Sequence, residues 1–205
     1  MRRLAVLAGA LTLAACGQED GSSTENWTAD VVTVDCCTTS RLPSPSGTKT
    51  LIFEPDGAEE VRVILSAGWL RREEIAAAAA PILASWGPRS QGVFLSGGRP
   101  GDFRLFRTPD NGAATELTGA PEAIASAYRA QSECPAASAP ELRGLGWSAD
   151  GRRVLVLAGA PSCSSMVMAL DAGDGRVLER YGADEAARRF AGLVPSAGAS
   201  GVTAP

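Results

Sequence analysis

Residues 147–157 read Trp147-Ser148-Ala149-Asp150-Gly151-Arg152-Arg153-Val154-Leu155-Val156-Leu157, a polar turn sequence followed at once by an apolar run. Two earlier segments, residues 44–53 and 87–96, align without a gap with residues 148–157. Serine, aspartate, glycine and proline favour turns, and a short apolar run bounded by such residues is typical of a buried strand. The sequence therefore contains three copies of a turn that leads into a strand.

A second apolar run follows each copy, at residues 61–65, 103–106 and 166–170. Turn residues such as Asp56-Gly57 separate the two runs of a copy. In the run at 61–65, Arg62 lies between Val61 and Val63, which is the period of a strand with one face in solvent. Each copy therefore predicts a β-hairpin.

A stretch with helical features follows each hairpin, at residues 71–86, 121–132 and 184–193. In the first stretch, the apolar residues that would share one helix face are Ile75, Ala79, Ile82, Leu83 and Trp86. Pro81 would kink or divide this helix. Pro121 suits the first turn of the second helix, and Asp184 suits the N-cap of the third.

The predicted fold class is α+β, with one antiparallel β-sheet built from three β-β-α repeats and the helices on one face. A further strand is expected at residues 30–34, before the first unit. The third unit has additional apolar runs at residues 142–147 and 177–181, which also favour strands.

Residues 147–157 are similar to the W-S-P-D-G motif and strand of TolB-type and WD40-like β-propeller blades. Residues 169–177 also follow the order of such blades, which is strand, aspartate, turn, glycine and strand. The first copy has Pro43 in place of the tryptophan, and the second copy lacks Asp-Gly. The resemblance implies partial propeller-like blades as the alternative fold. Propellers close with four to eight blades, and three units favour the α+β sheet.

The N-terminus has the layout of a secretory signal, with basic residues at Arg2 and Arg3 and an apolar run from Leu4 to Ala15. The run is shorter than the roughly 20 residues of a membrane-spanning helix. The segment Leu13-Ala14-Ala15-Cys16 resembles the bacterial lipobox, in which the cysteine is lipidated and becomes the new N-terminus. Multiple acyl chains on Cys16 would hold the protein to a membrane. In bacterial lipoproteins, an aspartate directly after the lipidated cysteine favours retention at the inner membrane. The resemblance therefore implies that Gly17 favours the outer membrane.

The expected organisation has four parts. Residues 1–15 form the lipoprotein signal peptide, and residues 16–29 the lipidated cysteine and a flexible tether rich in polar residues, glycine and serine. Residues 30–194 form one repeat-containing β-rich domain, and residues 195–205 a disordered tail. The net charge of −4 argues against a nucleic-acid surface.

Four cysteines remain beside Cys16, namely Cys36, Cys37, Cys134 and Cys163. In an oxidising compartment they suggest two disulfides with three connectivities. Adjacent cysteines bridge each other only with strain, so the expected outcomes join one of the N-terminal pair to the distant pair or join Cys134 to Cys163. We expect at least the Cys134–Cys163 bridge. The chain has no histidine and no CxxC spacing, so neither a metal nor a cofactor is expected.

The absence of histidine also excludes Ser-His-Asp and Cys-His catalytic sites. A serine–lysine site would need Lys49, which is expected to be solvated on the turn before a strand. The carboxylates of one predicted hairpin loop form an acidic cluster of Glu54, Asp56, Glu59 and Glu60. General acid–base chemistry would need two of them in a cleft, whereas an exposed acidic turn is the expected arrangement.

Among the tryptophans, Trp69, Trp86 and Trp147 lie at repeat junctions and are expected to pack between repeats, whereas Trp27 lies in the expected tether. We therefore expect no catalytic residues and a non-enzymatic envelope lipoprotein on the periplasmic side of the membrane. It would serve as a scaffold or bind another envelope protein. The alternative is a carboxylate-dependent hydrolase that acts on envelope carbohydrate. The sequence leaves the oligomeric state open.

Overall fold

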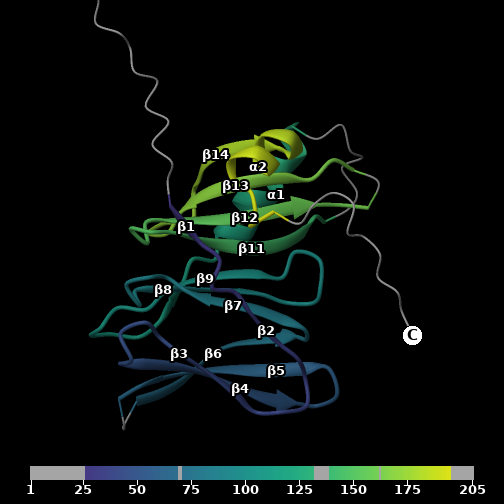
Figure 1. Ribbon diagram of the computed structural model, residues 1–205. Coiled ribbons are helices and arrows are strands. Elements are labelled where there is room, and N and C mark those ends of the chain that lie inside the picture. The colour runs from purple at the N-terminus through teal and green to yellow at the C-terminus, as the bar shows by residue number, and fades with distance from the viewer. Residues whose placement is uncertain (1–25, 69–70, 132–138, 162, 195–205) are drawn as a thin grey trace, which may run out of the picture.

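Three antiparallel sheets stack one above another in the computed structural model, which describes residues 26–68, 71–131, 139–161 and 163–194 (Figure 1). The first sheet contains β3 (Ser40–Pro43), β4 (Lys49–Asp56), β5 (Glu60–Ala67) and β6 (Arg71–Ala79), in that order. The second has the order β10-β9-β8-β7-β2, with β7 (Ile82–Trp86), β8 (Gly92–Ser96), β9 (Phe103–Arg107), β10 (Thr115–Glu116) and β2 (Val32–Val34). The third has the order β1-β11-β12-β13-β14, with β1 (Trp27–Thr28), β11 (Glu141–Ser148), β12 (Arg153–Gly159), β13 (Met166–Asp171) and β14 (Val177–Gly182).

The three aligned segments form equivalent turns, one before a central strand of each sheet. In each turn a backbone N–H donates to the carbonyl oxygen three residues earlier, over 2.8 Å. These bonds join Gly47 to Ser44, Ser90 to Gly87, and Gly151 to Ser148. The donor residues have φ angles of +71°, +59° and +70°. Glycine adopts this left-handed region without a steric penalty, and Ser90 is the non-glycine exception.

The hairpins predicted from the paired apolar runs are present. Strand β4 pairs with β5, β8 with β9, and β12 with β13, all antiparallel. The additional strands of the third unit are also present as β11 and β14, and the strand expected at 30–34 is β2. Turn chemistry and local apolar runs were therefore sufficient to locate these elements.

The predicted α+β class of three β-β-α repeats is wrong, because the chain is mostly antiparallel strand and belongs to a sandwich-like β class. The first expected helix, residues 71–86, is instead the two strands β6 and β7. In β6, Ala76 and Ala78 are buried and the intervening Ala77 is exposed, which is the period of a strand. Pairing with β5 along the whole of β6 overrides the helix propensity of alanine.

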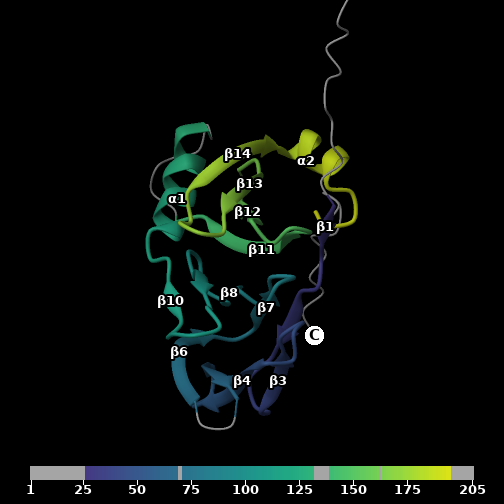
Figure 2. The same ribbon diagram turned by 90° about the vertical axis from the view of Figure 1, so that its left-hand side faces the viewer.

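Two helices are found among the described residues, α1 (Ala120–Gln131) and α2 (Ala183–Arg189). The first matches the expected helix at 121–132. The second is shorter than expected, and its N-cap is Gly182 rather than Asp184. The alternative class, partial propeller blades, is not adopted either, since the sheets stack as the layers of a sandwich (Figures 1 and 2).

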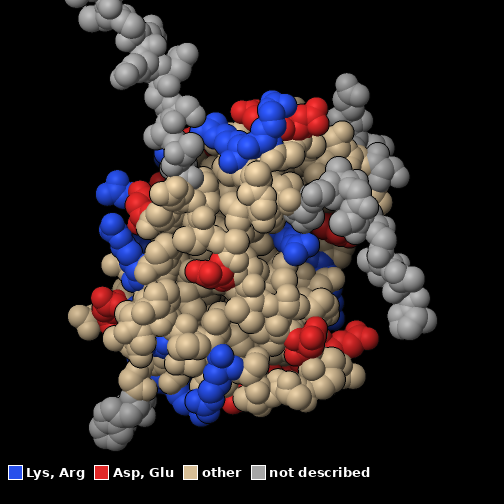
Figure 3. Space-filling view, in the orientation of Figure 1, with Lys and Arg blue, Asp and Glu red and all other residues tan. Residues whose placement is uncertain are grey.

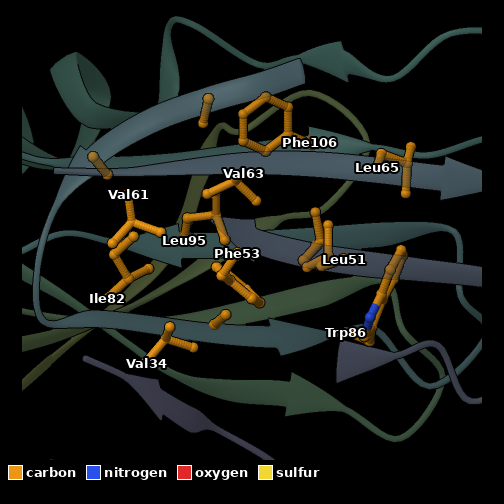
Figure 4. Packing of buried hydrophobic residues seen from close by; sticks show 14 residues of the cluster. Val34, Leu51, Phe53, Val61, Val63, Leu65, Ile82, Trp86, Leu95 and Phe106 are labelled. Carbon is orange, nitrogen blue, oxygen red and sulfur yellow. The ribbon is translucent and has the colours of Figure 1, made fainter. Parts of the chain in front are cut away.

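Three apolar clusters form the core. The first fills the space between the first and second sheets, where Phe53, Val63, Leu95 and Phe106 point toward one another (Figure 4). The second joins the second sheet, the third sheet and α1, with Phe94, Trp147 and Ile124 among its members. The third lies on the outer face of the third sheet, beneath α2.

The N-terminal segment, residues 27–43, contributes one edge strand to each of the three sheets. Strand β1 pairs with β11, β2 with β7, and β3 with β4. Trp27 was expected in the tether, but it is half-buried, and its ring makes an edge-on contact with Phe190 at a centroid distance of 5.7 Å. The segment therefore links all three layers along one side. None of the helices in the described ranges has the length and apolarity needed to cross a membrane.

Candidate functional site

The three equivalent turns lie next to one another at one end of the layers. Between the first and second sheets, the backbone N–H of Ser46 donates to Ser90 Oγ over 2.9 Å. Between the second and third sheets, the ring of Trp147 lies so close to Gly92 that an added Cβ would be 2.8 Å from Cη2. Glycine at position 92 therefore permits this close approach of the two layers.

Lys49 connects the first and second sheets, and its expected solvation is wrong, because the residue is 3% exposed. Its Nζ donates to the carbonyl oxygens of Ser90 and Thr108 and, over 3.0 Å, to Asp110 Oδ1. An ammonium group has three hydrogens to donate, and three acceptors surround this one. The arrangement makes Lys49 a structural link and does not favour a serine–lysine catalytic site.

A groove with a volume of about 630 Å³ opens where turns of the second and third sheets meet. A smaller cavity of about 280 Å³ adjoins it and shares Gln91, Gly92, Gly151 and Arg152. We call the two together the turn groove. Its charged lining residues are Arg89, Arg107, Arg152, Asp110, Asp150 and Asp171.

The turn groove lies at the ends of strands from both sheets. The β11–β12 and β13–β14 turns that contribute to it are at the left-hand end of the third sheet in Figure 1. In the space-filling view, acidic and basic side chains lie close together along that side (Figure 3). The groove is therefore polar and carries both signs of charge.

The aspartates of the turn groove already have partners within the chain. Asp110 is paired with Lys49. Asp150 accepts from the Arg152 backbone N–H over 3.0 Å and from the Ser148 hydroxyl over 2.7 Å, and these bonds lower the pKa of Asp150. Asp171 accepts from the backbone N–H of Gly173 over 2.6 Å. Each aspartate therefore already accepts a hydrogen bond from the chain, although the side chains of Asp110 and Asp150 are 74% and 51% exposed.

The arginines of the turn groove, in contrast to its aspartates, have few partners within the chain. Within the described residues, Arg89 and Arg107 make no ion pair, and Arg152 reaches only Asp150, with Nε at 3.9 Å. The Arg152 side chain is 82% exposed. Three guanidinium groups therefore border the groove with most of their hydrogen-bonding capacity directed to solvent.

Trp147 lies at the inner wall of the groove. It is 1% exposed and stacks on Phe94 at a centroid distance of 6.0 Å. Its Nε1 is buried and has no hydrogen-bond acceptor among the described residues. The expectation that Trp86 and Trp147 pack between repeats is confirmed, whereas Trp69 lies outside the described residues.

The acidic cluster of the first hairpin does not form a cleft. Glu54 is paired with Arg72 at 3.1 Å and with Arg62 at 3.6 Å, on the face of the first sheet away from the first apolar cluster. The other members are exposed on the β4–β5 turn, where Glu60 pairs with Arg99 and Asp56 with Arg62, and Glu59 has no ion pair within the described residues. These carboxylates lie apart from the turn groove, so their arrangement supports the exposed acidic turn.

The predicted cysteine sites are placed only in part. Cys16 and Cys134 lie outside the described residues, so the lipidation and the Cys134–Cys163 bridge stay predictions. Cys163 packs against the second apolar cluster. Cys36 and Cys37 are free thiols in the turn between β2 and β3.

Within the described ranges, histidine, cysteine and acidic residues do not gather in any group suited to a metal ion. A scan against models of protein families finds no match, and a search of curated proteins finds no similar chain. The turn groove was not predicted from the sequence. The repeated turns gave its only signal, because equivalent turns of neighbouring layers come together at one end.

Proposed function

We propose that the protein is a lipid-anchored binding module of the bacterial envelope, and that its turn groove binds an acidic segment of another envelope protein. The observation that carries this proposal is the charge balance of the groove. Its aspartates accept hydrogen bonds from the chain, whereas Arg89, Arg107 and Arg152 retain free donors.

The chemistry of arginine favours a carboxylate partner. A guanidinium group presents a planar set of donors that matches the two oxygens of a carboxylate. The arginines come from different layers, with Arg107 at the end of β9 and Arg152 in the turn between β11 and β12, and this arrangement suits an extended segment rather than a single ion. Backbone groups at Gly92, Gly151 and Gly173 are also part of the lining.

Reversing two of these charges tests the function. We expect the Arg107→Glu/Arg152→Glu double variant to lose its partner during affinity capture from detergent-solubilised envelopes, as measured by quantitative mass spectrometry. Each exposed contact contributes about 0.2–1 kcal/mol, and reversal replaces attraction with repulsion, so binding weakens by roughly tenfold or more. Added salt would weaken capture by the unmodified protein for the same reason.

The matched control is Arg41→Glu/Arg188→Glu, which changes the net charge equally at two exposed arginines outside the groove. This control variant should recover the same partner as the unmodified protein. Equal recovery by the groove variant and the control variant would contradict the proposed role of the groove.

The membrane anchor is tested separately at Cys16. We expect Cys16→Ser to move the protein from the membrane fraction to the soluble fraction. The predicted lipid is attached to the Cys16 thiol, which this substitution removes. Immunoblots of fractionated cells measure the shift, and Cys36→Ser, at a free thiol, serves as a cysteine control. A Cys16→Ser protein that stays with the membrane would show that another feature holds it there.

A further inference from the structure

Cys36 and Cys37 are sequence neighbours, and their sulfur atoms lie 2.6 Å apart. Side chains of successive residues in an extended chain point to opposite sides, so neighbouring cysteines do not ordinarily meet. Cys37 has a φ angle of +88°, a left-handed conformation that is uncommon outside glycine, asparagine and aspartate. This conformation interrupts the alternation and accompanies the contact between the two sulfurs.

The pair is accessible and separate from the other described cysteine. Cys37 is exposed and Cys36 is half-buried. Cys163 lies between β12 and β13 of the third sheet and packs against the second apolar cluster, whereas the pair lies between β2 and β3. Each thiol of the pair therefore has the other as its immediate neighbour.

The two thiols have different environments. The hydrogen bond with Cys37 raises the pKa of the Cys36 thiol, and partial burial and the nearby Asp35 carboxylate act in the same direction. Cys36 is therefore protonated at neutral pH. The more exposed sulfur of Cys37 is the one that a reagent from solvent reaches first.

We propose that Cys36 and Cys37 form a redox modification site, at which a low-molecular-weight disulfide reversibly oxidises the dithiol to a vicinal disulfide. In the first step the Cys37 thiolate attacks one sulfur of the reagent, and a mixed disulfide forms as one thiolate leaves. In the second step Cys36, deprotonated after its hydrogen bond to the Cys37 thiol is lost, attacks Cys37 Sγ and expels the second thiolate. The protein loses two electrons and two protons, and the reagent becomes two thiols.

The disulfide is expected to be reversible because Cys36 and Cys37 are joined by a single peptide bond. Consecutive Cα atoms are about 3.8 Å apart, whereas disulfides usually join Cα atoms about 4.4–6.8 Å apart. A bridge between neighbours is strained, and strained, exposed disulfides are the ones that thiols reduce readily. The site is thus suited to repeated oxidation and reduction rather than to permanent crosslinking.

The test uses the full chain, reduced with a phosphine and then exposed to glutathione disulfide. The reaction is stopped with acid, free thiols are alkylated, and the protein is cleaved before aspartate. The fragment of residues 35–55 contains Cys36 and Cys37 and no other cysteine. Its mass separates the dithiol, the glutathione adduct and the internal disulfide.

We expect the unmodified protein to yield a fragment that has lost two hydrogens, and dithiothreitol to restore them. Cys36→Ser and Cys37→Ser cannot close the ring, so the variant that retains Cys37 should stop at the glutathione adduct. Accumulation of the adduct in the unmodified protein, a crosslink from this fragment to the fragments with Cys134 or Cys163, or no reaction would each overturn the proposal. Circular dichroism of each variant verifies that it is folded.

Discussion

Trp147→Ala is expected to lower the free energy of unfolding by about 3–5 kcal/mol, the range for truncation of a large buried aromatic side chain. The indole is 1% exposed and lies where the second and third sheets meet. It stacks on Phe94, and Gly87 and Gly92 lack the side chains that would displace it. Its removal leaves a cavity that these rigid strands cannot fill. Urea denaturation followed by circular dichroism measures the loss.

Trp27→Ala is the matched control for this substitution. Trp27 also contacts an aromatic ring, but it is only half-buried in the two-residue edge strand β1. We expect its truncation to cost clearly less than that of Trp147. Equal losses for the two variants would show that the interface between the second and third sheets does not depend on Trp147.

Lys49→Met is expected to lower the free energy of unfolding by about 1–3 kcal/mol, the cost of leaving one buried group without its hydrogen bond. Methionine retains most of the apolar length of lysine and removes the ammonium group. The Thr108 carbonyl oxygen then loses its ammonium donor inside the protein, whereas the Ser90 carbonyl oxygen keeps the Thr108 hydroxyl as a donor. The contact with Asp110 contributes little, because that side chain is 74% exposed.

Arg152→Met is the control, since it also replaces a basic side chain with methionine but at a site that is 82% exposed. We expect this change to alter stability by no more than about 0.5 kcal/mol. If Lys49→Met proved as mild as Arg152→Met, the buried ammonium would not be the link between the first and second sheets that its hydrogen bonds indicate.

The sequence predicted the turns and hairpins well because their signals are local. The left-handed φ angles at Gly47 and Gly151 favour glycine, and an apolar run that follows such a turn has few alternatives to a strand. The second copy has Ser90 at the same position, so the turn is also compatible with a less favourable residue when the flanking layers hold it.

The error at residues 71–86 has a different origin. Runs of alanine are compatible with both a helix and a strand, and the helical spacing of Ile75, Ala79 and Ile82 arises across two strands. The decisive interaction is pairing with β5, which depends on tertiary structure. With that helix replaced by strands, the layers become sheet on sheet instead of helix on sheet.

The turn groove could not be predicted for a related reason. Its arginines come from segments that are distant in the sequence, with Arg107 at the end of β9 and Arg152 before β12. Single polar arginines are common in sequences, so neither Arg107 nor Arg152 indicates a binding site by itself. The sequence predicts a solvated Lys49 for the same reason. Its acceptors, the carbonyl oxygens of Ser90 and Thr108, belong to another layer and are distant in the sequence.

The N-terminal segment has a consequence for the order in which the molecule assembles. A chain that is synthesised or exported from its N-terminus releases β1 before every other strand, yet Thr28 contacts Trp147, 119 residues later. Bringing such distant residues together is entropically costly and slow. The first and second sheets have most of their partners within residues 32–116, whereas β1 must wait for β11. The earliest strand to emerge thus waits for its partner until every strand of the first two sheets has been released, and a chain interrupted before residue 141 would leave Trp27 and Thr28 without β11.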